Sequence, residues 1–100
     1  MKYNVIVDEI VKLQLDNYVR FSTNVSTKFA KSIRTNFYNA LYELQNNPDR
    51  FPLWQPSFEV YKPYHNILIK KRYSVIYYIE DNNIFIDYLL DCHMDNSKLF

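Results

Sequence analysis

An apolar stripe at helical spacing in the second quarter of the chain constrains the fold most. Its members follow one another at intervals of one, three and four residues, which places them on one face of an α-helix. They are Phe29, Ala30, Ile33, Phe37, Ala40, Leu41 and Leu44. We expect this helix to start near Val25 and to end near residues 46–48, because Pro48 biases the preceding residue away from helical geometry. A helix of this kind buries its apolar face against another element.

Two shorter segments precede this helix. Tyr3, Val5 and Val7 alternate with the polar residues Asn4 and Asp8, which is the period of a half-buried strand. Residues 9–22 carry apolar side chains at helical spacing, and Asp8 is placed to cap the first turn. Residues 22–24 are turn-forming and supply a plausible cap for the second helix.

Three further apolar or alternating runs lie in the second half of the chain. Residues 64–70, 72–79 and 84–90 are separated by short polar segments, so they are predicted to form consecutive antiparallel strands. The chain has no glycine, and Asn82 or Asn83 is the residue best able to adopt the positive φ of the last hairpin. Residues 48–57, with three prolines and several aromatics, should form an ordered crossing loop.

The order of these elements predicts an α+β fold, β-α-α-β-β-β, with two N-terminal helices packed on one face of an antiparallel sheet. Alternation along residues 72–79 separates two sets of side chains. The set expected in the core is Tyr73, Val75, Tyr77 and Ile79. The set expected on the face left for function is Arg72, Ser74, Ile76 and Tyr78.

Composition limits the class of protein. A chain of 100 residues with 48% hydrophobic residues can bury one core, so residues 1–100 are predicted to form a single domain. No export signal is recognisable at the start, and the apolar runs are shorter than the roughly 20 residues that cross a bilayer, so we expect a cytoplasmic protein without membrane contact. The single cysteine, Cys92, is expected to be a small buried residue.

The same inventory excludes several kinds of chemistry. One cysteine and two histidines without a carboxylate cluster make a metal site improbable, and the lack of glycine excludes a glycine-rich phosphate loop. No cofactor is expected. The net charge is only +1, but every charged residue within residues 17–42 and 60–79 is positive. These stretches are either a polyanion-binding patch or an ordinary solvated surface.

Four segments, in this order, resemble the RelE/ParE superfamily of bacterial type II toxins. They are the early strand and helix, residues 41–52, residues 71–81 and residues 84–95. The last segment contains Asp91-Cys92-His93, which is similar to the aspartate-cysteine-arginine ending of one branch of these toxins. The resemblance covers nearly the whole chain.

The resemblance implies a toxin that is produced with an antitoxin, its cognate partner. Members of the superfamily act either as ribosome-dependent messenger-RNA endonucleases or as inhibitors of DNA gyrase, so the fold does not choose the target. A third alternative is a catalytically weakened homologue that is retained as a partner of the antitoxin. Of these alternatives, the endonuclease is the one we expect.

This chain departs from the branch at several cationic positions. His65 and Asn66 stand where relatives have arginine and lysine, and His93 stands where they have arginine. Ser74 aligns with another arginine of RelE, while Arg72 lies two residues earlier. RNA cleavage of this type needs a base for the 2′-hydroxyl, positive charge at the phosphate and an acid for the leaving oxygen.

On this chemistry His93 is the candidate general acid or base and Arg72 the candidate phosphate clamp. The alternative for His93 is a surface histidine bonded to Asp91 or Asp95. The alternative for Arg72 is a structural pair with an acidic residue, for which Glu80 and Asp87 are the candidates, or a contact with the antitoxin.

The candidate substrate-binding residues are Lys70, Lys71, His65 and Phe100. The first three would supply charge near the sheet edge. Phe100 lies near the position where many relatives have a tyrosine, so it could stack on a base but could not transfer a proton. For His65 a structural role is the favoured alternative.

Overall fold

The elements follow one another in the order that the sequence predicted. The structure, a computed structural model, describes residues 2–56, 58–59 and 62–92. The helices and strands of these residues are β1 (Asn4–Val7), α1 (Glu9–Thr23), α2 (Thr27–Asn46), the 3-10 helix η1 (Pro48–Arg50), β2 (His65–Ile69), β3 (Tyr73–Glu80) and β4 (Asn83–Asp91). Both predicted helices and all four predicted strands are confirmed within a few residues of their expected ends.

The four strands form one mixed sheet in the order β1-β4-β3-β2. β3 is antiparallel to both β2 and β4, as predicted, but β1 lies parallel to β4. The prediction of a fully antiparallel sheet was therefore wrong. Short polar turns predict the hairpins β2–β3 and β3–β4, whereas β1 pairs with a strand almost 80 residues away, as in the register Asn4↔Asn83, and no local signal sets that direction.

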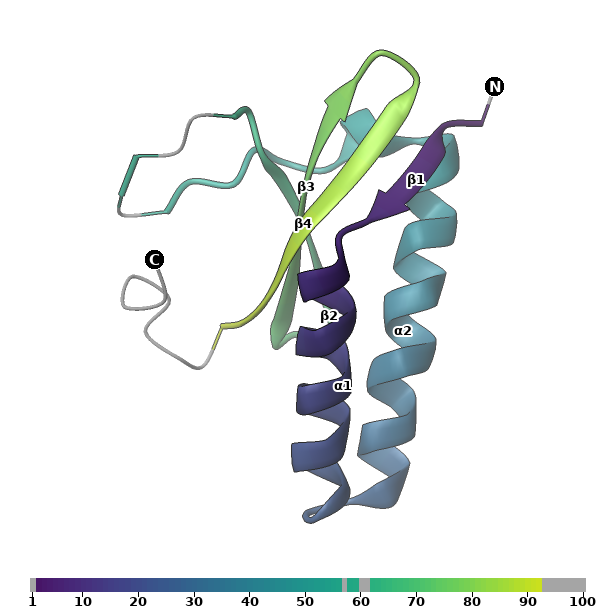
Figure 1. The fold of residues 1–100 in the computed structure, drawn as a ribbon, viewed down its shortest axis with the longest axis vertical. Helices are drawn as coiled ribbons and strands as arrows, with labels where there is room; N and C mark the ends of the chain where they lie inside the picture. Colours follow the sequence, from purple (N-terminus) through teal and green to yellow (C-terminus); the bar gives the residue numbers. More distant parts are fainter. Residues whose placement is uncertain (1, 57, 60–61, 93–100) are drawn as a thin grey trace.

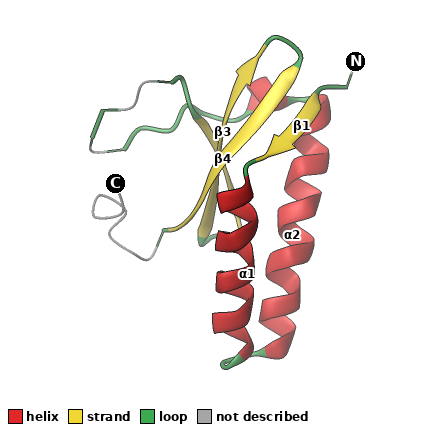
Figure 2. Cartoon of the chain, in the orientation of Figure 1, coloured by secondary structure: helices red, strands yellow, loops and turns green. Residues whose placement is uncertain are grey.

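The two helices lie side by side and antiparallel, and they pack against one face of the sheet (Figure 2). Asp8 caps α1 as predicted, because its Oδ1 accepts the Ile10 N–H at 2.9 Å. The predicted cap of α2 at residues 22–24 was wrong. Ser22 is buried within α1, and Ser26 caps α2 by accepting the Phe29 N–H at 3.1 Å.

The main core fills the space between the helices and the sheet. Six of the seven residues of the predicted stripe are buried in this core or packed against it, and Tyr73, Val75 and Tyr77 meet them from β3. The seventh, Ala30, is also buried. Beyond the end of β1, α1 lies beside the edge of β4. The Gln14 Oε1 of α1 accepts the Leu89 N–H of β4 at 2.8 Å. The helical pair thus satisfies a strand edge as well as covering apolar surface.

The opposite face of the sheet carries a second apolar cluster. The buried members of this cluster are Tyr64, Ile76, Tyr78 and Leu90, and Trp54, Phe85 and Tyr88 pack around them. This face was expected to be left free for function, but it is largely covered by aromatic rings. The loop before β2 is ordered as predicted over residues 48–56, since the Trp54 N–H donates to the Tyr64 carbonyl at 2.7 Å.

The two hairpins use left-handed backbone at residues other than glycine. Lys70 and Lys71 have φ of 54° and 55°, and Asp81 has φ of 57°. The prediction that Asn82 or Asn83 would adopt positive φ was wrong, because Glu80 pairs with Asn83 and the left-handed residue is the first one between them. Aspartate tolerates this conformation for the same reason as asparagine.

Among the helices of the described residues, none combines the length and the apolar character that a membrane span requires.

Two matched leucine substitutions test the core. Leu44→Ala in α2 should lower the free energy of unfolding by about 2–5 kcal/mol, because Leu44 is fully buried and its loss leaves a cavity. Leu13→Ala in α1 should change it by less than about 0.5 kcal/mol, because Leu13 is 59% exposed. Urea denaturation followed by circular dichroism measures both, and equal effects would contradict the packing described here.

Candidate functional site

The turn between β2 and β3 places three cationic residues in succession. The Arg72 N–H donates to the Ile69 carbonyl at 3.1 Å, which closes a two-residue loop over Lys70 and Lys71. Positive φ at both central residues is the pattern of a type I′ hairpin turn, which favours asparagine and glycine. Lysine in this conformation costs about 1 kcal/mol per residue. Strain of this kind is often retained where the side chains serve a function.

Lys70 and Lys71 are both exposed and are not ion-paired within the described residues. The Lys70 ammonium lies 5.4 Å from the centre of the Phe29 ring, near the start of α2. The turn therefore carries two uncompensated positive charges at one end of the sheet, opposite the β3–β4 hairpin (Figure 1).

Arg72 is held by Asp91 at the end of β4. Its Nε lies 3.2 Å and its Nη2 3.0 Å from the Asp91 carboxylate, whose side chain is only 7% exposed. Hydrogen bonding to Asp91 raises the pKa of Arg72, so the guanidinium stays charged. A structural pair was one of the predicted alternatives, but its partner is neither Glu80 nor Asp87.

The position of this pair differs from the one that alternation predicted. The Arg72 guanidinium lies 5.3 Å from the centre of the Tyr73 ring, and Tyr73 is the register partner of Asp91 and a member of the main core. Arg72 therefore faces the helix side of the sheet and not the side of Ile76 and Tyr78. The turn breaks the alternation, because the backbone leaves strand geometry at Lys70 and Lys71.

His65 lies at the other end of β2 and occupies a structural position. Its Nδ1 donates to the Phe51 carbonyl at 2.8 Å, and its ring stacks on Tyr77 with 5.4 Å between centroids. The structure therefore does not bring His65 together with the cations of the β2–β3 turn. The structural alternative describes this residue better than substrate binding does.

The end of β4 adds one correction. Cys92 is exposed, whereas it was predicted to be buried. Partial desolvation and then the Asp91 carboxylate raise the pKa of its thiol. His93 and Phe100, the candidate proton-transfer and stacking residues, lie outside the described residues.

Two hydrogen-bonded pairs of polar side chains lie on the sheet face opposite the helices. The sequence analysis did not identify them as a site. The Tyr64 hydroxyl donates to the Asp87 Oδ2 at 2.7 Å. The Lys62 ammonium donates to the Tyr78 hydroxyl at 2.9 Å and lies 4.1 Å from the centre of the same ring. The Tyr64 and Tyr78 rings are edge to face, 5.7 Å apart, so the two hydrogen-bonded pairs adjoin. We call Lys62, Tyr64, Tyr78 and Asp87 the open-face network.

A β-bulge explains why Asp87 reaches this network. Tyr77 pairs with Ile86 while Ile76 pairs with Tyr88, so Asp87 is an extra residue in β4. A bulge re-aims the side chains around it, and bulges are frequent beside active sites. Alternation along β3 correctly predicts Tyr78 on this face. The bulge has no signature in the sequence, so the presence of both Asp87 and Tyr88 on this face could not be predicted.

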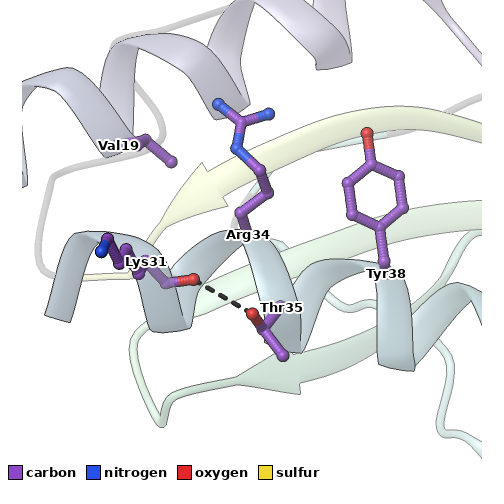
Figure 3. Close-up of a pocket in the computed structure, with 5 residues that line it drawn as sticks. All are labelled: Val19, Lys31, Arg34, Thr35 and Tyr38. Carbon is purple, nitrogen blue, oxygen red and sulfur yellow. Dashed lines mark hydrogen bonds between the residues drawn. The ribbon is translucent and has the colours of Figure 1, made fainter. Parts of the chain in front are cut away.

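The outer side of the helical pair carries a hollow of about 480 Å³. Figure 3 shows its lining, with Val19 from α1 and four residues from α2. Of its two cations, Arg34 is paired with Asp16 at 2.9 Å, and Lys31 accepts the Thr35 hydroxyl at its backbone carbonyl. None of the predicted site residues lines this hollow.

The described residues contain no group of three or more side chains that could hold a metal ion. A scan against protein-family models finds no match to this chain, and neither does a search of curated proteins. The likeness to RelE/ParE toxins therefore stays a prediction.

The Arg72–Asp91 pair can be tested by a double-mutant cycle. Arg72→Ala should lower the free energy of unfolding by about 2 kcal/mol, because it leaves a buried carboxylate without its cation. Adding Asp91→Asn should recover part of this loss, since the buried charge is then gone. Urea denaturation of the two single variants and the double variant measures the coupling, and strictly additive effects would contradict a structural role for the pair.

Proposed function

We propose that this protein is the toxin of a bacterial type II toxin–antitoxin pair, with a fold of the RelE/ParE type, and that it inhibits translation as a ribosome-dependent messenger-RNA endonuclease. Its partners would be a cognate antitoxin, the ribosome and messenger RNA, and it would act in the cytoplasm.

The observation that carries the proposal is the strained turn at Lys70 and Lys71. A type I′ turn built from two lysines is less stable than one built from asparagine and glycine, so its retention needs a reason outside folding. Two free ammonium groups on a rigid hairpin suit the phosphates of an RNA chain, to which lysine contributes charge without base specificity. The neighbouring cation Arg72 adds little to this field, because the Asp91 carboxylate offsets its charge.

The element order and the sheet support the same proposal. Two helices on one face of a four-stranded sheet leave the second face to an aromatic cluster edged by Lys62 and Asp87. Aromatic rings on a sheet are a common surface for unstacked RNA bases.

A second candidate is inhibition of DNA gyrase by binding alone. Two observations favour it. Arg72 is hydrogen-bonded to Asp91 and His65 to the Phe51 carbonyl, so two of the residues expected to act on a phosphate are already bound within the fold. A weakened homologue that only binds an antitoxin fits the same two observations.

Induced expression in a bacterial host tests the toxin function. Growth should stop after induction of the intact reading frame and continue after induction of a frameshifted copy. Mapping of transcript ends on translating ribosomes should then show new cuts within coding regions. Trapped gyrase–DNA complexes without such cuts would favour the second candidate, and normal growth with soluble protein would refute both toxin functions.

A turn replacement should separate stability from activity. Lys70→Asn combined with Lys71→Gly should raise the free energy of unfolding by about 1–2 kcal/mol, because the new residues favour the type I′ turn. Ribosome-dependent cleavage should nevertheless fall at least tenfold, and the salt dependence of RNA binding should weaken, since two phosphate contacts are lost.

The matched control for this replacement is Asp81→Gly, at the other left-handed position. It should also stabilise the protein, but it should leave cleavage unchanged, because Asp81 carries no positive charge and makes no phosphate contact. Unchanged cleavage by the turn replacement would contradict a role of Lys70 and Lys71 in substrate binding.

A further inference from the structure

The open-face network contains a carboxylate with one oxygen held and one oxygen free. The Asp87 Oδ2 accepts the Tyr64 hydroxyl, while no described residue hydrogen-bonds to Oδ1. Burial and the hydrogen bond to Asp87 raise the pKa of Tyr64 far above its usual value, so the phenol remains protonated and keeps donating. Tyr64 is itself buried among the aromatic rings, which fixes the orientation of the carboxylate.

The other half of the network joins a cation to a hydroxyl group. Lys62 is exposed, and its ammonium donates to the Tyr78 oxygen. This arrangement leaves the proton of the Tyr78 hydroxyl free to be donated to another group. Hydrogen bonding to Tyr78, with a smaller contribution from the Asp87 carboxylate, raises the pKa of Lys62, so the side chain stays positive at neutral pH.

We propose that Asp87 is the general base and Tyr78 the general acid of RNA cleavage by this protein, with Lys62 as the cation at the reacting phosphate and Tyr64 as the residue that positions Asp87. The assignment rests on the proposed endonuclease function. Lys62 takes the phosphate-binding role expected of Arg72, whose guanidinium is bound to Asp91. Asp87 and Tyr78 take the proton-transfer role expected of His93, which lies outside the described residues.

The reaction balances with these groups alone. The Asp87 Oδ1 takes the proton of the ribose 2′-hydroxyl, and the 2′-oxygen forms a bond to the adjacent phosphorus. The bond from phosphorus to the 5′-oxygen breaks, and that oxygen takes the proton of the Tyr78 hydroxyl. The products are a 2′,3′-cyclic phosphate and a 5′-hydroxyl. Lys62 stabilises both the crowded phosphate and the phenolate that Tyr78 becomes, and solvent then restores both protonation states.

The aromatic cluster would hold the substrate in this position. Trp54, Phe85 and Tyr88 surround the network and are only partly buried, so their exposed atoms offer an apolar surface to unpaired bases. Contact of this kind would orient the ribose and the phosphate toward Asp87 and Tyr78.

Asp87→Asn and Tyr78→Phe test the two proton-transfer roles. Each change keeps the shape of the side chain and removes its proton chemistry, so each should lower the rate of ribosome-dependent cleavage at least 100-fold. Association with ribosomes should be unchanged. The matched controls are Asp16→Asn and Tyr42→Phe, which make the same chemical changes on the helices and should cleave at the wild-type rate.

Tyr64→Phe tests positioning. The carboxylate then loses the hydrogen bond that fixes its orientation, so kcat should fall about tenfold while KM stays unchanged. A rise in KM with kcat unchanged, or a fall in kcat matched by a loss of folded protein, would show that Tyr64 does not position the base.

The outcomes distinguish the site from the function. If Asp87→Asn or Tyr78→Phe cleaves RNA at the wild-type rate, this assignment is wrong, but the endonuclease function still stands. A parallel loss of cleavage and ribosome association would also overturn it, because the residues would then serve binding. No cleavage by the wild-type protein would overturn both. Thermal unfolding checks each variant, and Asp87→Ser replaces Asp87→Asn if the latter does not fold.

Discussion

β3 is buried on both of its faces, and the other elements are arranged around that burial. Five consecutive residues, Tyr73 to Tyr77, are almost inaccessible to water, and Tyr78 at the end of this run keeps 9% of its surface exposed. One set of these side chains faces α1 and α2, while Ile76 and Tyr78 face the second cluster. A sheet strand with two apolar faces requires cover on both sides, and in a chain of this size the helices alone provide only one. The loop that contributes Trp54 and Tyr64 provides the other.

The same burial decides where polar groups can lie. Inside the sheet a hydroxyl must find a partner, as Tyr77 does by donating to the Pro48 carbonyl at 2.6 Å. The charged residues of the sheet therefore lie in its turns, at the ends of its strands and at the bulge, where water or an opposite charge reaches them. Lys70 and Lys71 occupy a turn, and Asp91 ends β4 with Arg72 as its cation. Asp87 gains access to the second face through the bulge.

The candidate site illustrates how far residue types alone can lead. The sequence shows cations at residues 70–72, and Lys70 and Lys71 are not ion-paired within the described residues. Arg72 and His65 have the right chemistry for a phosphate, but the fold engages them with Asp91 and Phe51. Tyr64 and Asp87 are 23 positions apart and form a 2.7 Å hydrogen bond that no spacing rule would predict.

The helices, the strands and their order follow from the amino-acid sequence, because hydrophobic period and turn residues are local properties of the chain. The helix face and the side of β3 that enter the main core follow from the same patterns. The parallel pairing of β1, the cover of the second sheet face and the partners of Arg72 and Asp87 arise only in the packed fold. These features depend on contacts between residues far apart in the chain, and their geometry is fixed only when the whole core packs.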